Sequence, residues 1–169
     1  MEPRDFATDN CSIARTLGVV GEKWTFLVLR EVFRGVRRFD DIQAVTGAPR
    51  QVLTDRLAAL VDHAVLRRQP YREPGRRERH EYRLTDKGLD LYPVLLALLA
   101  WGDRHVPAPD GPALRVEHRD CGAEVALHLR CAAGHDVAAM REVAPRPGPG
   151  ARPRSTHHES PIEAGARGR

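Results

Sequence analysis

The stretch RRFDDIQAVTGAPRQVLTDRLAALVDH, residues 37–63, predicts two helices joined by a tight turn. In the first helix Asp40 and Asp41 sit in the opening turn, where carboxylates oppose the positive end of the helix dipole. Phe39, Ile42 and Val45 recur at helical spacing, so we expect them to share one buried face.

The second helix follows Gly47 and Pro49, because glycine readily adopts the left-handed conformation of a helix end and proline suits a first helical turn. The apolar residues expected to form its buried stripe are Leu53, Leu57, Leu60 and Ala64. The residues on the opposite face and its flank, which we expect to contact DNA, are Arg50, Gln51, Thr54, Asp55 and Arg56.

The polar face of the second helix has the chemistry of a base reader. A helix of about 14 residues is about 20 Å long and fits a major groove about 12 Å wide. Arginine pairs with guanine, glutamine with adenine, and aspartate accepts a hydrogen bond from cytosine. The pattern is therefore typical of a DNA-reading helix-turn-helix, although an ordinary helical hairpin inside a core is the alternative on these residues alone.

Two short strands are expected directly after the helix pair, over residues 65–71 and 80–84, joined by the loop REPGRRER at 72–79. Residues 66–83 carry seven arginines against three glutamates, and such clustered positive charge favours a polyanionic partner. This hairpin is a wing if it binds DNA and a solvated surface loop if it does not. The loop arginines expected to contact phosphate or the minor groove are Arg72, Arg76, Arg77 and Arg79.

Apolar helices are expected on both sides of this unit. Before it, Ser12 is a suitable N-cap for a helix over residues 13–20, with Ile13, Leu17 and Val20 on the inner face. A second helix is expected over residues 24–33.

After the wing, Thr85 is expected to cap a long helix that reaches residue 104 and bends at Pro93. This helix is apolar over more than one face, so it needs a second surface to cover it. A second copy of the chain is the simplest candidate, since a two-fold dimer matches paired half-sites on DNA. The residues expected at this contact are Leu95, Leu99 and Trp101.

Four segments together resemble the HxlR-type winged-helix transcriptional regulators over residues 10–106: CSIARTLGVVGEKWTFLVLREVFRGVRRFDDIQ (11–43), RQVLTDRLAALVDHAVL (50–66), EYRLTDKG (81–88) and LYPVLLALLAWGD (91–103). The resemblance implies a bacterial dimeric regulator, a repressor rather than an activator, whose N-terminal and C-terminal helices build the dimer contact. One departure is Ala48, which stands where such proteins often place a serine cap; losing a cap costs about 1 kcal/mol.

Cys11 matches the position of a thiol that senses oxidants or electrophiles in some members of that family. A thiol beside a helix N-terminus, with Arg15 one turn further on, can react as a thiolate. An oxidant or small-molecule effector is therefore one expectation, and a buried, inert cysteine is the other.

The segment after Pro107 contains the last two of the three cysteines in the chain. Its Cys-Gly sequence at 121–122 is similar to one knuckle of a zinc ribbon, whereas the second knuckle lacks its usual second cysteine. The residues that would make a Cys₂His₂ zinc site here are His118, Cys121, Cys131 and His135. A metal-free hairpin is the alternative, and we expect no other cofactor.

Composition limits the remaining choices. With 169 residues and a hydrophobic content of 41%, the chain has room for one ordinary domain and an appendage. The longest apolar run, 94–101, is too short to span a bilayer and the first residues lack signal-peptide character, so we expect a soluble cytoplasmic protein without a membrane partner.

We therefore expect a mainly α fold with a small β-wing (α+β), a winged helix-turn-helix with flanking dimerisation helices. The expected division is a flexible N-terminus (1–10), the DNA-binding and dimerisation domain (11–106), a zinc-ribbon-like extension (107–144) and a disordered tail (145–169) rich in Pro, Gly and Arg. A thiol- or zinc-dependent enzyme and a winged helix that binds only protein are the alternatives, but no serine–histidine–aspartate set, phosphate loop or carboxylate pair favours catalysis.

Overall fold

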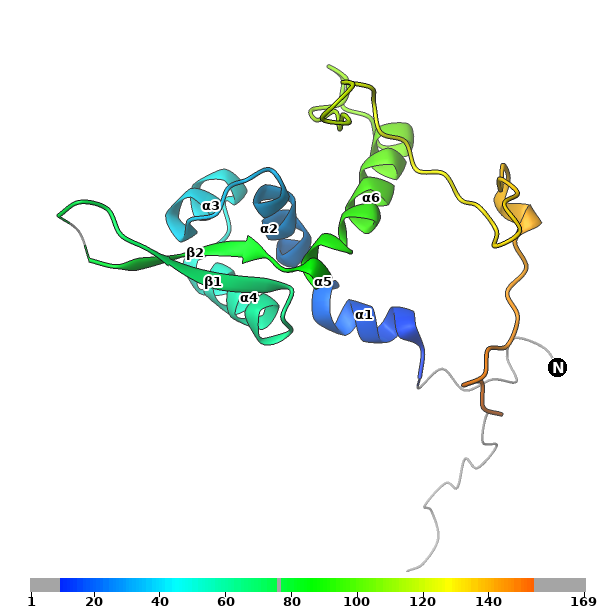
Figure 1. The fold of residues 1–169 in the computed structure, drawn as a ribbon, viewed down its shortest axis with the longest axis horizontal. Helices are drawn as coiled ribbons and strands as arrows, with labels where there is room; N and C mark the ends of the chain where they lie inside the picture. The colour runs from blue at the N-terminus through cyan, green and yellow to red at the C-terminus, as the bar shows by residue number, and fades with distance from the viewer. Residues whose placement is uncertain (1–9, 76, 154–169) are drawn as a thin grey trace, which may run out of the picture.

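The computed structural model describes residues 10–75 and 77–153. These residues form a mostly helical protein with one two-stranded antiparallel sheet, which confirms the expected mainly α fold with a β-wing (Figure 1). The helices are α1 (Ser12–Val20), α2 (Lys23–Phe33), α3 (Phe39–Thr46), α4 (Arg50–Asp62), α5 (Asp86–Leu89) and α6 (Tyr92–His105). The strands are β1 (Leu66–Tyr71) and β2 (Arg79–Leu84), and a short 3-10 helix, η2, spans Met140–Glu142.

The core lies where α2, α3 and α4 pack together against the base of the sheet. Each element contributes its own apolar stripe, as periodicity predicts. The largest buried apolar side chains are Leu29, Ile42, Leu53, Leu57, Leu60 and Leu66.

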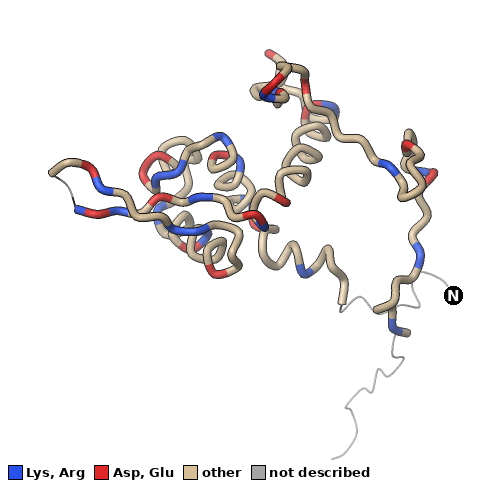
Figure 2. The backbone as a smooth tube through the Cα atoms, viewed as in Figure 1, with Lys and Arg blue, Asp and Glu red and all other residues tan. Residues whose placement is uncertain are grey.

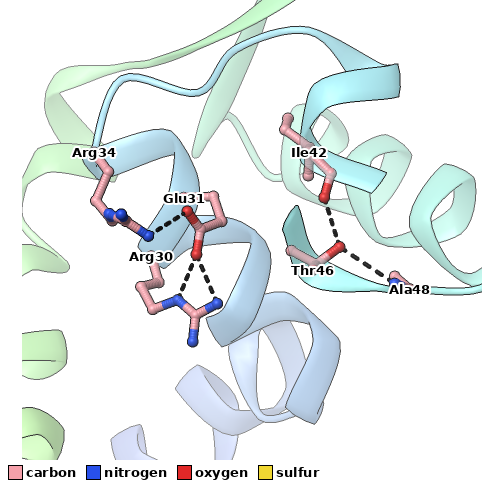
Figure 3. Close-up of polar contacts among 6 residues, drawn as sticks. All are labelled: Arg30, Glu31, Arg34, Ile42, Thr46 and Ala48. Carbon is pink, nitrogen blue, oxygen red and sulfur yellow. Dashed lines mark hydrogen bonds and ion pairs between the residues drawn. The ribbon is translucent and has the colours of Figure 1, made fainter. Parts of the chain in front are cut away.

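The turn between α3 and α4 is built without a side-chain cap on α4. Gly47 adopts the left-handed conformation at φ 68°, and Pro49 occupies the N-cap position of α4. Thr46 compensates in part: its hydroxyl donates to the Ile42 carbonyl at 2.6 Å and accepts from the Ala48 amide at 3.3 Å (Figure 3). Ala48 is itself buried, so this departure from the serine pattern contributes packing in place of a cap.

Two residues that we expected on buried faces are exposed. Val45 lies on the solvent side of the short helix α3, and Ala64 lies beyond the end of α4. Ala64 takes a positive φ of 54°, which turns the chain from α4 into β1 and ends the stripe at Leu60. Ala64 was misplaced because α4 ends at Asp62. Val45 was misplaced for another reason: steps of three residues fall short of a full turn of about 3.6, so Val45 has rotated away from the face of Phe39.

A buried carboxylate organises the end of α2. Glu31 is 1% exposed, and its two oxygens accept from Arg30 at 2.6 Å and from Arg34 at 2.9 Å (Figure 3). The Glu31 carbonyl also accepts from the Val36 amide at 3.0 Å. Because a buried charge is tolerated only when it is paired, these contacts fix the path from α2 towards α3.

The wing is anchored to the helices at its base. Its strands pair from Leu66 opposite Leu84 to Tyr71 opposite Arg79. The Tyr82 amide donates to the Arg37 carbonyl at 2.8 Å, so the loop before α3 extends the sheet by one short contact. The tip projects away from the helical core (Figure 1).

The long helix expected after the wing is divided in two. Thr85 caps α5 as expected, its hydroxyl accepting from the Gly88 amide at 3.1 Å. Helix α5 ends at Leu89, and α6 begins at Tyr92 with Pro93 in its first turn. Proline ends helices at the residues before it, so the predicted bend is present as a break.

Helix α1 differs from the expectation at both its start and its face. Cys11, and not Ser12, is the N-cap residue, and no side chain caps the helix. Of the expected inner face, Val20 is buried as predicted, whereas Ile13 and Leu17 are 72% and 54% exposed. Within residues 10–75 and 77–153, only the end of α1, at Val19 and Val20, packs against the core.

Residues 107–153 leave the end of α6 and follow an open, extended path round towards the start of α1 (Figure 1). The Asn10 side-chain amide meets this path, donating to the Gly150 carbonyl at 2.6 Å. Within the described residues, none of the helices is long and apolar enough to cross a lipid bilayer. The predicted flexible segment before residue 10, and the part of the predicted tail beyond 153, lie outside the described residues.

Candidate DNA-binding surface

Helix α4 presents its two faces as predicted. Leu53, Leu57 and Leu60 are buried against the core. The four polar residues of the first turns face solvent, and Arg56 lies half-buried on the flank. The exposed residues are Arg50, Gln51, Thr54 and Asp55.

Hydrogen bonds within this face decide which groups remain available to DNA. The Gln51 amide donates to the Asp55 carboxylate at 2.8 Å, so Asp55 orients the side chain that we expect to read a base. The Thr54 hydroxyl donates to the Arg50 carbonyl at 2.9 Å. Its methyl group is the part left to meet a groove floor, where threonine methyls contact thymine.

Arg50 is held at the start of α4 by the first turn of α3. Its guanidinium carbon lies 4.8 Å from the centre of the Phe39 ring, and its Nη1 lies 3.9 Å from an oxygen of Asp40. The other oxygen of Asp40 lies 3.5 Å from Nη1 of Arg79, at the start of β2. One carboxylate thus links the start of α4 to the wing.

The role of Asp40 was missed from the sequence, which indicated only a helix-dipole residue. Its partners are distant in the chain, so no local spacing could reveal the link. Exposed ion pairs of this kind contribute about 0–1 kcal/mol. Asp40 therefore holds Arg50 and Arg79 only weakly.

The wing brings a second group of basic residues beside the start of α3. Figure 2 shows Lys and Arg positions recurring along both strands and at the nearby helix starts. Arg72, Arg77 and Arg79 lie on the exposed loop and strand end, and Gly75 forms the turn at φ 74°. Arg76, the remaining arginine predicted to contact DNA, lies outside the described residues.

A further arginine, Arg38, belongs to this surface and was not predicted. Its guanidinium donates to Glu73 at 2.7 Å and stacks 4.5 Å from the Tyr71 ring centre. Arg38 thereby fixes the wing against the N-terminus of α3. The sequence signal for it, two arginines before FDDI, was visible but not distinguishable from the general abundance of arginine.

The predicted dimer residues on α6 divide into two groups. Leu95 packs against the core, and Leu99 lines an apolar cavity of about 280 Å³ between α2 and α6. Trp101 is 60% and Leu98 51% exposed on a helix with no fully buried residue. Leu98 lines the same pocket as Leu99, although it is half exposed, whereas Trp101 is the most exposed of these residues and does not line the pocket.

The four predicted zinc ligands are brought together only in pairs. Cys121 Sγ lies 3.4 Å from Nδ1 of His118, and Cys131 Sγ lies 3.5 Å from Nδ1 of His135. Across residues 10–75 and 77–153, no three His, Cys, Asp or Glu side chains are grouped closely enough to hold a metal ion. A single described chain therefore does not assemble the Cys₂His₂ set.

Cys11 is a free thiol, half-buried at the start of α1. Its carbonyl accepts from the Arg15 amide at 3.1 Å, whereas the Arg15 guanidinium is turned towards the Ser12 hydroxyl at 3.1 Å. Cys11 thus lies at a helix N-terminus as expected, whereas the guanidinium of Arg15 is directed to Ser12 and not to the thiol.

Comparison with known proteins relates the whole arrangement to one family. The model of the HxlR-like helix-turn-helix family matches residues 19–110. Over 139 residues the chain is 43% identical to Rv3095 of Mycobacterium tuberculosis, an uncharacterized HTH-type transcriptional regulator, covering 82% of this chain and 87% of that one. It is 38% identical over 89 residues to the HTH-type regulator sll1512 of Synechocystis, covering 52% and 64% of the two chains.

Two solved structures share the fold. The crystal structure of PA1607 superposes with a TM-score of 0.70 at 37% identity, covering 82% of this chain and 96% of that one. The redox regulator HypR in its oxidized form superposes with a TM-score of 0.52 at 27% identity, covering 56% and 97%.

Proposed function

The chain belongs to the HxlR-like helix-turn-helix family of transcriptional regulators, and on that premise we propose that it acts as a homodimeric repressor. Each subunit would insert α4 into the major groove and lay its wing along the adjacent backbone. We place this action in the cytoplasm, where a bacterial chromosome lies, and assign the chain no catalytic step.

The observation that carries this proposal is the single surface formed by α4, the start of α3 and the wing. It combines groups suited to bases, Arg50 and Gln51, with groups suited to phosphate, Arg77 and Arg79. Base contacts give specificity and phosphate contacts give affinity and register. A winged helix that binds only protein would not need both kinds of group on one face.

The homodimer is supported by the apolar helices that one chain leaves uncovered. Ile13 and Leu17 on α1, and Leu98 and Trp101 on α6, are exposed. Helices α1 and α6 themselves lie on the side of the molecule away from the tip of the wing (Figure 1). A two-fold contact between these helices would leave both copies of α4 free to meet half-sites one helical turn of DNA apart. Loss of either copy would halve the contacts with DNA.

Thiol-dependent control is a second property that we propose, on the position of Cys11. A partly exposed thiol at the beginning of a helix in the proposed dimer contact would alter that contact when oxidised. The test compares operator binding before and after treatment with a thiol oxidant. Cys11→Ser should abolish the difference, and an unchanged response in this variant would exclude Cys11.

The main experiment compares operator and random DNA, with the operator first identified by mapping the genomic fragments that co-purify with the protein. Arg50→Ala and Gln51→Ala should each cost about 1–3 kcal/mol on the operator and much less on random DNA. Arg77→Ala should weaken both DNAs similarly and make the log–log salt dependence shallower by about 1. Arg104→Ala, which removes the same charge from the end of α6, is the matched control.

Asp55 provides the sharpest variant of this series. Because it orients Gln51 and would lie near phosphates, Asp55→Ala should relax base specificity while total affinity stays the same or rises. If the variants at Arg50, Gln51 and Asp55 change operator and random binding by one common factor, α4 is not the reading helix.

A further inference from the structure

The extension after α6 contains two tight turns, each of which joins one cysteine to one histidine. In the first, the His118 amide donates to the Ala123 carbonyl at 2.8 Å, and Gly122 has a φ of 69°. In the second, the Cys131 amide donates to the His135 carbonyl at 2.9 Å, and Gly134 has a φ of 87°. Both turns close an antiparallel bridge, between Glu117 and Glu124 and between Arg130 and Asp136.

The sulfur and nitrogen atoms in each turn have the separation of two ligands on one zinc ion. Zn–S bonds of about 2.3 Å and Zn–N bonds of about 2.0–2.1 Å at a tetrahedral angle place S and N about 3.6 Å apart. The observed separations are 3.4 Å for His118 and Cys121 and 3.5 Å for Cys131 and His135. A thiol–imidazole hydrogen bond would explain one such contact, whereas its repetition in two similar turns points to a shared ligand.

Each turn supplies only half of a tetrahedral site, and the chain between the turns keeps the halves apart. Residues 124–130 run extended from one turn to the other, with Val125, Leu127 and Leu129 alternating on one exposed face. Within residues 10–75 and 77–153, the two cysteine–histidine pairs do not come together into one group that could hold a metal ion.

The same extended segment has a free hydrogen-bonding edge. The Val125 amide donates to the Val116 carbonyl, and the Leu129 carbonyl accepts from the Val137 amide, both at 2.8 Å. The backbone hydrogen-bonding groups of Val125 and Leu129 therefore point to the edge of the segment on which the two turns fold back. Backbone groups of successive residues in a strand point to opposite edges. Ala126 and His128 therefore face the other edge, and neither makes a backbone hydrogen bond within the described residues.

The ligands are arranged almost symmetrically about Ala126. Cys121 and Cys131 lie five residues to either side of it, and His118 and His135 lie eight and nine residues away. Two copies of the segment that run antiparallel about an axis at Ala126 would place Cys121 of each chain near the partner subunit's Cys131. A two-fold contact is self-complementary, so it creates two such meetings at once.

We propose that the extensions of two copies pair in this way and hold two zinc ions, each bound by His118 and Cys121 of one chain and by the partner subunit's Cys131 and His135. The proposal rests on the homodimer proposed above. Two thiolates neutralise each Zn²⁺, and the two thiol protons pass to solvent on binding. The Nε2 atom of His118 lies 4.0 Å from an oxygen of Asp120, which is beyond direct hydrogen-bond distance.

The first test measures metal in the full chain, purified without an added histidine tag or chelator. We expect about one zinc per chain, hence two per dimer, and after Co²⁺ replacement the visible absorption of a tetrahedral S₂N₂ site. His128→Ala, in the same segment, is the control and should retain the metal. Zinc near zero in the wild-type chain, or retained after Cys121→Ala, would overturn the site.

The second test decides whether one chain or two supply the ligands. One variant carries His118→Ala with Cys121→Ala, and the other carries Cys131→Ala with His135→Ala. Neither should bind zinc alone, but mixed dimers of the two should bind about one ion, because one of their two sites keeps all four ligands. Mixed dimers without zinc would show that each site lies within one chain and would overturn the shared arrangement.

Operator binding is measured on the same samples, so that the two proposals fail separately. Variants that lose zinc yet keep sequence-specific binding leave the proposed function intact. A wild-type protein that binds zinc but has no preference for any DNA sequence would remove the proposed function and leave the metal site.

Discussion

The region from α2 to β2 and the flanking helices α1 and α6 differ in how far their apolar side chains are buried. Between α2 and β2 five leucines are almost completely buried: Leu29, Leu53, Leu57, Leu60 and Leu66. Helix α6 is at least as apolar by sequence, yet none of its residues is fully buried. Helix α1 leaves Ile13 and Leu17 in solvent.

This difference separates what one chain stabilises from what requires a second surface. Fully burying a large apolar side chain contributes about 1.5–3 kcal/mol. The core leucines gain this free energy of burial by packing within one chain, whereas the exposed side chains of Leu98 and Trp101 gain little of it there. We therefore expect substitutions in the core to act on folding and substitutions on the outer face of α6 to act on association.

The largest effect is expected in the core. Leu57→Ala should lower the free energy of unfolding by about 2–5 kcal/mol, because Leu57 is fully buried and its truncation leaves a cavity in the core beneath α4. Denaturant unfolding at fixed protein concentration measures it, with Leu98→Ala as the matched control. Equal losses in both variants would remove the distinction between core and flank.

Charge on the outer face of α6 should act next, and on the oligomer rather than the fold. Leu98→Asp with Trp101→Asp would bury carboxylates in the proposed contact, which costs several kcal/mol when they are unpaired. Sedimentation should show monomers whose circular dichroism matches the wild type. A persistent dimer would place the contact elsewhere, and a wild type that is monomeric at micromolar concentration would contradict it altogether.

The junction between the two regions depends on Gly88. A Cβ at this position would lie 2.3 Å from the Val65 carbonyl oxygen and 3.0 Å from a Leu84 methyl carbon. Gly88→Ala must therefore shift α5 against the wing, and such overpacking costs about 1–3 kcal/mol. Gly102→Ala, on α6 with open space around it, is the control. Equal stability of the two variants would show that α5 moves freely.

The smallest effect is expected at the cap of α5. The Thr85 hydroxyl accepts from the Gly88 amide at 3.1 Å and donates to the Ala64 carbonyl at 2.6 Å. Thr85→Ala should cost about 1 kcal/mol, and Thr85→Ser should recover most of it because it keeps the hydroxyl. Thermal unfolding of the three proteins resolves this, and a serine variant as unstable as alanine would assign the effect to the lost methyl group.

The spacing of residues along the chain was enough to predict the faces and ends of several helices. The repeat of Leu53, Leu57 and Leu60 sets the buried side of α4, and it therefore sets the exposed side on which Gln51 and Asp55 lie. Gly47 ends α3 and Thr85 caps α5 for equally local reasons. Within each turn of the extension, a cysteine and a histidine three or four residues apart meet because the turn alone decides their distance.

Only the tertiary structure decided features that depend on distant parts of the chain. Asp40 joins Arg50 to Arg79 because the packing of α3 against α4 and the wing brings three separate segments together. Ile13 and Leu17 form a helical stripe by sequence, but whether a stripe is covered depends on a surface elsewhere. The two cysteine–histidine pairs likewise form locally, whereas the extended path of 124–130 determines that one chain keeps them apart. Periodicity and turn chemistry act over a few residues, and the meeting of segments is set by the packing of the whole chain.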